Sequence, residues 1–347
     1  MNEKVTEVPA TPEQPCESEF RPAFSWQGRM ATGLMRTFVK PFVARVPLTK
    51  RVMKFSQLCF DTVTLALPVH PDVHIAPADV GGVPGEWLIH GRNVIAGRVF
   101  LYFHGGGYFF GSPRSHRALT WRLSRGCRAR VLALDYRQPP DWHYPAPLED
   151  AVRAYRSLLE QGIQPENIIL GGDSAGGNLT LVTLIRLREL GLPLPAAAVL
   201  ISPWADLTVT GESVMANASR EPMIPVNALK FISRSYSNDD DPSSPLISPI
   251  YADLSGLPPM LIQVGSTEVL LSDAQRIAQN AIKAGVSCRL QVWEDMMHVF
   301  QALSGWVPEA SLAVREIGSW VEQAISDAGG EVELRNRATL VTGSGSR

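Results

Sequence analysis

The chain has 347 residues, of which 45% are hydrophobic and 19% are charged, and its formal net charge is −2. This composition is typical of a globular protein and excludes the collagenous, disordered and disulfide-scaffold classes. The 32 basic and 34 acidic residues nearly balance, so no global field of either sign favours nucleic acid or an anionic membrane as partner. The length suits two domains, or one large α/β domain with an appendage, and a small molecule is the expected partner.

The cysteines and the N-terminal residues bear on the cellular compartment. Cys16, Cys59, Cys127 and Cys288 are scattered without C-x-x-C spacing, which favours free thiols in a reducing compartment over a zinc site or a secreted disulfide framework. The first twenty residues are polar and acidic and lack the apolar core of a signal peptide. No stretch reaches the roughly 18 apolar residues of a membrane span. We expect a cytoplasmic protein with a flexible start over residues 1–23.

The segment from Phe24 to Lys54 combines apolar residues at helical spacing with seven basic and no acidic residues. Pro41 and Pro47 are expected to interrupt any single helix there. The simplest prediction is a pair of short helices packed on the domain, and the alternative is a helix that docks on a membrane surface or a partner. Residues 24–84 are assigned to an N-terminal segment that precedes the main domain.

From residue 98 onward, short apolar runs alternate with helical stretches. The predicted strands are Arg98–Phe103, Arg130–Leu134, Ile168–Leu170, Ala197–Ile201, Met260–Val264 and Cys288–Trp293. Their near-continuous apolar character is typical of parallel strands covered by helices on both faces. Helical spacing predicts helices at Pro147–Gln161, Ala175–Leu190 and Asp273–Gly285. The alternation indicates βαβ units and therefore the α/β class with a mostly parallel sheet.

Residues 205–249 interrupt this alternation. They contain one predicted helix, around Pro225–Ser237, followed by a turn-rich Asn-Asp-Asp-Asp-Pro run. An insertion of this length is more often a lid than an idle loop, so we expect a cap insertion here. Residues 85–204 and 250–326 then form the catalytic domain, and residues 327–347 form a flexible tail.

A G-x-S-x-G motif directly follows the strand at 168–170 and opens the helix at 175–190. In this setting the motif predicts a nucleophile elbow, in which Gly172 and Gly176 leave room for a sharp turn. Ser174 would present its hydroxyl at the positive end of the helix dipole. A plain turn serine is the alternative.

An H-G-G-G run at residues 104–107 follows the first predicted strand. It lacks the Lys-Ser/Thr of a phosphate-binding P-loop, so an oxyanion hole is the better interpretation. The backbone N–H groups of Gly105 and Gly106, together with that of Ala175, are the expected donors. Gly107 is expected to permit close approach rather than to donate, and His104 is expected to be structural.

The base and the acid should follow the nucleophile in the chain. His298 lies just beyond the last predicted strand, and the other six histidines all precede Ser174, so chain order favours His298 as the base. The loop after Met260–Val264 offers two acids. Asp273 lies where a helix N-cap belongs, whereas Glu268 is closer to the strand end and is the preferred triad acid; Asp295 is a third choice.

Together these motifs resemble the hormone-sensitive-lipase family of α/β-hydrolase esterases. H-G-G-G lies upstream of G-D-S-A-G-G, and the D-Y-R, Y-P-A, S-P-W-A-D-L and L-P-P stretches agree over about residues 85–320. The family usually has Asp-Pro-Leu where this chain has Glu268-Val269-Leu270, and the glutamate resembles that of one branch of bacterial carboxylesterases. The resemblance implies an α/β-hydrolase fold, with a mostly parallel central sheet flanked by helices. It further implies a helical cap, made from the N-terminal cap segment at residues 24–84 and the insertion at residues 205–249. It also implies roles as nucleophile and base for Ser174 and His298.

The implied function is that of a serine carboxylesterase acting on short-to-medium acyl esters or lactones through an acyl-enzyme. It needs no cofactor, and no cluster of side chains offers a metal site. An amidase or peptidase on the same triad, or a non-catalytic binding protein on this scaffold, are the alternatives. Large or polar side chains beside the motifs are expected to line a walled substrate pocket: Tyr108, Phe109, Asp173, Trp204 and Val299. A homodimer is expected to form, if at all, through an edge strand near Cys288–Trp293.

Overall fold

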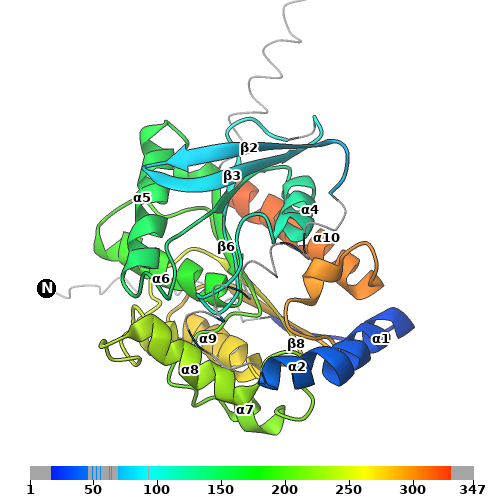
Figure 1. Cartoon of the computed structure of the whole chain (residues 1–347). Coiled ribbons are helices and arrows are strands. Elements are labelled where there is room, and N and C mark those ends of the chain that lie inside the picture. Colours follow the sequence, from blue (N-terminus) through cyan, green and yellow to red (C-terminus); the bar gives the residue numbers. More distant parts are fainter. Residues whose placement is uncertain are drawn as a thin grey trace, which may run out of the picture.

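The computed structural model describes residues 17–45, 69–92 and 94–329, together with residues 49, 52, 55, 62 and 64. The predictions for residues 1–16 and 330–347, and for Cys59 and Pro47, lie outside these described residues. Helices flank a nine-stranded sheet with the order β1-β9-β8-β7-β6-β4-β5-β3-β2 (Figure 1).

All six strands expected from the apolar runs are present, and they form the parallel centre of the sheet. They are β4 (Val99–Phe103), β5 (Arg130–Leu134), β6 (Ile168–Asp173), β7 (Ala197–Ile201), β8 (Met260–Gly265) and β9 (Cys288–Trp293). Adjacent strands of this set pair in parallel. The carboxyl ends of parallel strands meet at one edge of a sheet, which is where the motifs of the sequence follow their strands.

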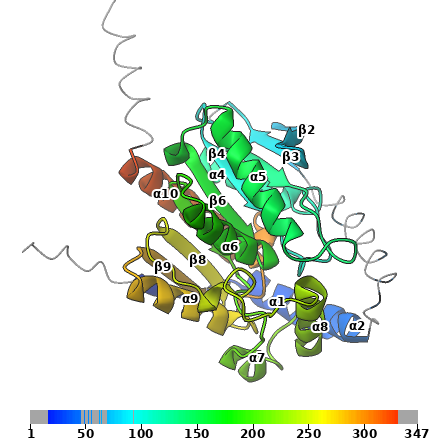
Figure 2. The same cartoon turned by 90° about the vertical axis from the view of Figure 1, so that its left-hand side faces the viewer.

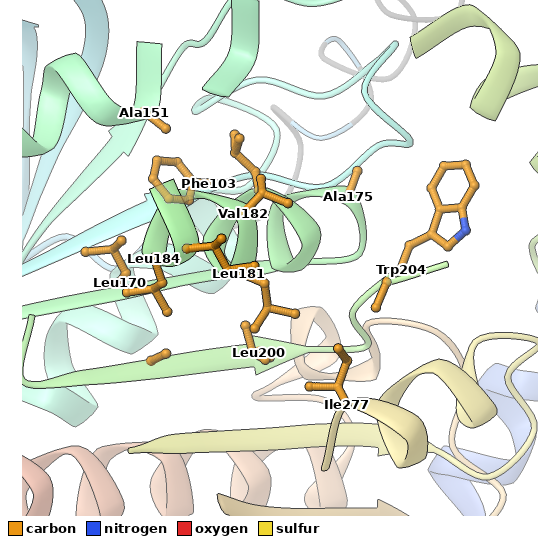
Figure 3. Close-up of a cluster of buried hydrophobic side chains, with 14 of the residues drawn as sticks. Phe103, Ala151, Leu170, Ala175, Leu181, Val182, Leu184, Leu200, Trp204 and Ile277 are labelled. Carbon is orange, nitrogen blue, oxygen red and sulfur yellow. The ribbon is translucent and has the colours of Figure 1, made fainter. Parts of the chain in front are cut away.

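Helices cover both faces of the sheet (Figure 2). One layer holds α5 (Ala146–Glu160), α6 (Ala175–Glu189) and α9 (Leu271–Lys283), and the other holds α4 (Arg117–Cys127) and α10 (Pro308–Asp327). Alternate residues of β4 enter the two cores, with Leu101 and Phe103 on the α6 side and Phe100 on the α10 side. Figure 3 shows the α6 side, where Leu170 and Leu200 of the strands lie beside side chains of the helix. Both faces being covered explains why these strands are apolar throughout.

Three further strands extend the sheet and correct the expected domain bounds. β2 (Val73–Val80) and β3 (Val83–His90) form an antiparallel hairpin that pairs with β5. A cap segment ending at residue 84 would cut this hairpin, so the predicted bound is wrong. β1 (Glu17–Arg21) pairs in parallel with β9, which shows that the predicted flexible start does not extend through residues 17–21.

The position of β1 also removes the expected dimer contact. β9 is not an edge strand, because β1 lies along its outer side with Glu19 opposite Gln291. The backbone groups that an edge strand offers to a second chain are therefore already paired. The prediction that Cys288–Trp293 is an edge strand is therefore wrong, whereas the homodimer itself stays a prediction.

The N-terminal segment is helical from Trp26 to Arg45. α1 (Trp26–Leu34) continues through a π-helical turn, η1 (Met35–Val39), into α2 (Lys40–Arg45). The expected interruption at Pro41 does not occur. In the π-helical turn just before the proline, the Lys40 N–H donates to the Met35 carbonyl, and the helix continues beyond it.

The insertion between β7 and β8 holds α7 (Glu212–Ala216), which was not predicted, and α8 (Val226–Ser237), which was. In both ribbon views α2 lies beside this insertion (Figures 1 and 2). The remaining short helices are η2 (Pro165–Asn167), η3 (Pro249–Tyr251) and η4 (Phe300–Leu303).

Candidate active site

Ser174 lies at a sharp turn between β6 and α6. Its backbone has φ 55° and ψ −118°, a conformation that L-residues rarely adopt. The Ser174 N–H donates to the carbonyl of Ile201, the last residue of β7, at 2.8 Å and so fixes the turn to the neighbouring strand. A Cβ atom on Gly172 or Gly176 would lie 2.3 or 1.9 Å from the Phe103 carbonyl oxygen. Only glycine fits at either position, as the elbow motif predicts.

The glycine run after β4 supplies backbone donors, but not the pair that was expected. The N–H of Gly105 donates to Oδ1 of Asp173 at 2.9 Å, so the prediction that Gly105 is an oxyanion donor is wrong. The N–H groups of Gly106 and Gly107 donate to no residue that the structure describes. Ala175 begins α6, where an N–H has no intrahelical acceptor. The available donors are therefore Gly106, Gly107 and Ala175.

Asp173 holds the glycine run against the elbow. Besides Gly105, its buried carboxylate accepts a hydrogen bond from the Tyr102 hydroxyl and faces Nε2 of His116 at 3.6 Å. Burial alone would raise the pKa of Asp173, but His116 and the Tyr102 hydroxyl hold it below the ordinary value. The Asp173 carboxylate is thus ionised and bonded to groups of the protein itself. Its assignment to the substrate pocket is corrected for this reason.

His104 has the structural role that was expected. Its ring is fully buried and stacks on Tyr136 at a centroid distance of 4.4 Å. Burial lowers the pKa of His104 to about 3, so the ring is neutral and its Nδ1 donates to the Gly105 carbonyl at 2.8 Å. The Tyr136 hydroxyl donates to the His104 carbonyl at 2.7 Å.

Glu268 and His298 come from different loops and meet at 2.7 Å between Oε2 and Nδ1. The other carboxylate oxygen accepts hydrogen bonds from Ser202 Oγ at 2.8 Å and from the Gly265 N–H at 2.6 Å. Burial alone would lower the pKa of His298, but the hydrogen bond and charge of Glu268 raise it above the ordinary value of 6.5. The ring is therefore oriented with Nδ1 on Glu268, which leaves Nε2 for proton transfer.

Comparison with known proteins identifies the family. A family model for the α/β-hydrolase fold matches residues 100–302. An acetyl-hydrolase from Streptomyces hygroscopicus is 45% identical over 256 residues, which cover 73% of this chain and 85% of that protein. A crystal structure of an esterase from the bacterial hormone-sensitive lipase family is 41% identical, with a TM-score of 0.81, over 87% of this chain and 99% of that one. EstE5, in a crystal soaked with p-nitrophenyl butyrate, is 36% identical with a TM-score of 0.82 over 87% of this chain and all of that one.

This chain belongs to the hormone-sensitive-lipase family of α/β-hydrolases. The predicted family and the predicted fold, a mostly parallel central sheet flanked by helices, are confirmed. So is the predicted class of enzyme: the protein is a carboxylic ester hydrolase.

The structure of this esterase adds a buried carboxylate that the sequence does not indicate. Glu221, in the insertion after α7, is fully buried, and its Oε2 accepts from the N–H of Val269, the residue next to Glu268, at 3.0 Å. Its Oε1 accepts from the Met223 N–H at 2.8 Å. Burial raises the pKa of Glu221, and its charge acts on His298. No motif or spacing connects residue 221 to residue 268, so only tertiary structure reveals this group.

The two other candidate acids of the esterase lie elsewhere. Asp273 is not the N-cap of α9, which is Leu270. Its Oδ2 instead accepts from the N–H groups of Ala205 and Asp206, each at 2.9 Å, and burial raises its pKa to about 8. Asp295 is half-buried and faces arginine side chains at 3.8 and 3.9 Å. Glu268 is the acid whose carboxylate contacts His298 Nδ1.

Two of the predicted pocket residues are core residues in the esterase. Tyr108 has no accessible surface, stacks on Tyr236 at 3.8 Å and donates to Asn178 Oδ1 at 2.7 Å. Trp204, at the end of β7 (Figure 3), is also buried and donates from Nε1 to the Asp206 carbonyl at 3.0 Å. Both side chains pack and donate hydrogen bonds inside the protein, so their assignment to the substrate pocket is corrected.

Phe109 and Val299 remain pocket predictions. The Phe109 ring contacts the position where a Cβ on Gly107 would lie, at 3.2 Å. Val299 directly follows His298, is only partly buried and donates its N–H to Ser202 Oγ at 3.2 Å. Phe109 therefore lies beside Gly107 of the glycine run, and Val299 lies beside His298.

Other features of the esterase lie outside this site. Cavities of about 740 and 700 Å³ lie against β9 and α10 and against α5 and α6, and neither is lined by Ser174, Glu268 or His298. Cys127 is a buried free thiol, and Cys288 is buried in β9. Over the described ranges, no three His, Cys, Asp or Glu side chains are grouped to hold a metal ion. In the same part of the chain, no helix is long and apolar enough to cross a membrane.

Proposed function

We propose that this esterase hydrolyses short-to-medium acyl carboxylic esters or lactones with a triad of Ser174, His298 and Glu268. The observation that carries the proposal is the 2.7 Å contact between Glu268 Oε2 and His298 Nδ1, at the same sheet edge as the elbow serine. Glu268 follows β8, His298 follows β9 and Ser174 follows β6. The chain order nucleophile, acid, base is that of α/β-hydrolases.

The reaction proceeds through an acyl-enzyme. Ser174 Oγ attacks the ester carbonyl carbon while its proton passes to Nε2 of His298, and Glu268 stabilises the imidazolium through Nδ1. The N–H groups of Gly106, Gly107 and Ala175 stabilise the negative oxygen of the tetrahedral intermediate. His298 then protonates the leaving alkoxide as the C–O bond breaks. Water, deprotonated by His298, attacks the acyl carbon. The bond between that carbon and Ser174 Oγ then breaks as His298 returns the proton to Oγ, which releases the carboxylic acid.

The preference for short acyl chains rests on two lines of support. The similar proteins include one named acetyl-hydrolase, and the EstE5 crystal was soaked with a butyrate ester. In this chain, the apolar side chains of Phe109 and Val299 lie next to the glycine run and to His298. We also propose that α1 and α2, with α7 and α8, form a cap beside the site.

A panel of p-nitrophenyl esters of graded acyl length, measured beside the matching anilides, tests the proposed function. We expect turnover of the esters, little turnover of the anilides, and no turnover of either class by the folded Ser174→Ala variant. Faster cleavage of anilides than of esters would make the protein an amidase. Substantial ester hydrolysis by Ser174→Ala would exclude Ser174 as the nucleophile.

A further inference from the structure

Exposed apolar side chains gather on the N-terminal segment that runs from β1 through α1 to η1. We define the N-terminal face as the exposed side chains Phe20, Phe24, Trp26, Leu34 and Phe38. Trp26 and Phe38 are 67% and 69% exposed. Five of the fourteen large hydrophobic side chains that are exposed on the described residues thus fall within 19 consecutive positions. Scattered apolar residues on a surface are normal, but a cluster of this kind marks an interaction site.

The inner side of the same segment is fixed to the rest of the protein. Thr32 Oγ1 donates to the Asp295 carbonyl at 3.1 Å, and a Cβ on Gly28 would lie 2.5 Å from Met296 Cε. α1 therefore packs on the loop that carries His298. Farther along, Lys40 Nζ donates to the Ala218 and Glu221 carbonyls at 2.5 and 2.7 Å, in the insertion. These contacts set which side of the segment faces outward.

Basic side chains accompany the exposed aromatic ones. From residue 24 to residue 60 the chain has seven basic residues and no acidic one, although its overall net charge is −2. Within the described part of this stretch, Arg29, Arg36 and Arg45 are all exposed. The carboxylate nearest Arg29 is that of Asp295, at 3.9 Å, and Arg45 donates to a carbonyl of its own helix. The charge is therefore segregated on the same segment as the apolar side chains.

We propose that the N-terminal face docks the esterase peripherally on a bilayer leaflet that carries anionic phospholipids. Tryptophan and phenylalanine are favoured at the membrane interface, and nearby arginines are attracted to anionic headgroups. A second copy of the chain fits the face less well, because a two-fold interface would bring the same basic face of both copies together. Docking on lipid instead pairs these charges with phosphates.

Docking in this orientation would place the loops of His298 and Glu268 close to the lipid surface. The segment contacts the His298 loop directly through Thr32. Through Lys40 it contacts the insertion, whose Glu221 in turn accepts from the N–H of Val269, the residue next to Glu268. Esters that partition into a bilayer would thereby reach the enzyme at a raised local concentration. This inference goes beyond the proposed function and does not depend on which residues form the triad.

Flotation of the full chain with vesicles tests the proposal. The probes are vesicles of phosphatidylcholine alone and of phosphatidylcholine mixed with phosphatidylglycerol, at low and high salt. The face variants are Trp26→Ser combined with Phe38→Ser, and Arg36→Glu. The matched controls are Trp142→Ser, at a half-exposed tryptophan in the loop before α5, and Arg156→Glu, at an exposed arginine on α5. Hydrolysis of soluble p-nitrophenyl acetate shows that each variant is folded.

We expect the wild-type chain to float with the anionic vesicles, and high salt to weaken this binding. Either face variant should lower the partition coefficient by roughly tenfold or more, while the two controls leave it unchanged. Failure of the wild type to bind anionic vesicles, or equal binding by the face variants, would overturn the proposal. So would a dimer in sedimentation that dissociates in the Trp26/Phe38 variant, because the face would then be covered by a second copy.

Discussion

Three donors converge on the carboxylate of Glu268: His298 Nδ1, Ser202 Oγ and the Gly265 N–H. An amide has only one acceptor oxygen, so Glu268→Gln must place its NH₂ group against one of these donors and cannot stabilise the imidazolium. We expect kcat to fall by several orders of magnitude, on the order of the 10⁴-fold loss typical of an acid-to-amide change in such triads. Steady-state kinetics on a p-nitrophenyl ester measures this loss.

Asp273→Asn is the matched control for that measurement. Both backbone donors of Asp273 bond to the same oxygen, Oδ2, so an amide oxygen can replace it, and we expect kcat within a few-fold of the wild-type value. A larger loss for Asp273→Asn than for Glu268→Gln would transfer the role of triad acid to Asp273.

The pH dependence of the esterase should reflect the raised pKa of His298. The ring must be neutral to accept the proton of Ser174, so activity is lost as the pH falls through this pKa. Because Glu268 raises the pKa above 6.5, the acid limb of kcat/KM should have its midpoint above 6.5. A pH titration of kcat/KM locates this midpoint, and a profile flat down to pH 4 would show that His298 is not the base.

At the level of single residues, the sequence predicts the role of a residue well where that role depends only on neighbouring residues in the chain. The elbow demands glycine at 172 and 176 for steric reasons that the motif already contains. The oxyanion donors were predicted less well, because the N–H of Gly105 is used by Asp173, 68 positions away in the chain. Which amide of a glycine run stays free is decided by such a tertiary partner.

The insertion between β7 and β8 contributes a charge to the catalytic region through Glu221. Its carboxylate favours the protonated form of His298 and so raises the pKa of that ring. Glu221→Gln removes this charge and leaves one oxygen to accept from the backbone N–H groups of Met223 and Val269. We therefore expect the acid limb of kcat/KM to move to lower pH. A loss of stability alone would not move it.

Glu212→Gln, at an exposed position of the same insertion, is the control and should leave the profile unchanged. An unshifted acid limb in Glu221→Gln would mean that Glu221 carries no charge when His298 titrates, and its role would then be limited to holding the loop.

Among the larger elements, the buried parallel strands were predictable because an apolar run covered on both faces leaves a clear pattern. β1 was not predictable, because its sequence is polar. Its place in the sheet depends on pairing with β9 and on contacts such as that between Glu19 and Gln291 at 3.0 Å. α10 does carry a helical signal, with Ala310, Val314, Ile317 and Val321 buried at intervals of three and four. It could have been predicted from that spacing.

For the molecule as a whole, the preferred acyl length measures how large the acyl pocket is between the catalytic core and the proposed cap. Each methylene that fits adds up to about 0.8 kcal/mol of burial, and a chain that meets the pocket wall is overpacked. We therefore expect kcat/KM to peak at short acyl chains, on the order of two to six carbons, for soluble esters presented without vesicles. A maximum at long chains would show an open acyl groove in place of a walled pocket.

Covalent labelling tests most directly whether Ser174 is a nucleophile activated by His298 and Glu268. An alkyl fluorophosphonate reacts with an activated serine and leaves a stable adduct that peptide mass spectrometry can place. We predict one adduct, on Ser174, formed at least about 10³-fold more slowly in His298→Ala, because the general base is missing. An adduct on another residue, or labelling of Ser174 at an unchanged rate in His298→Ala, would contradict the proposed triad.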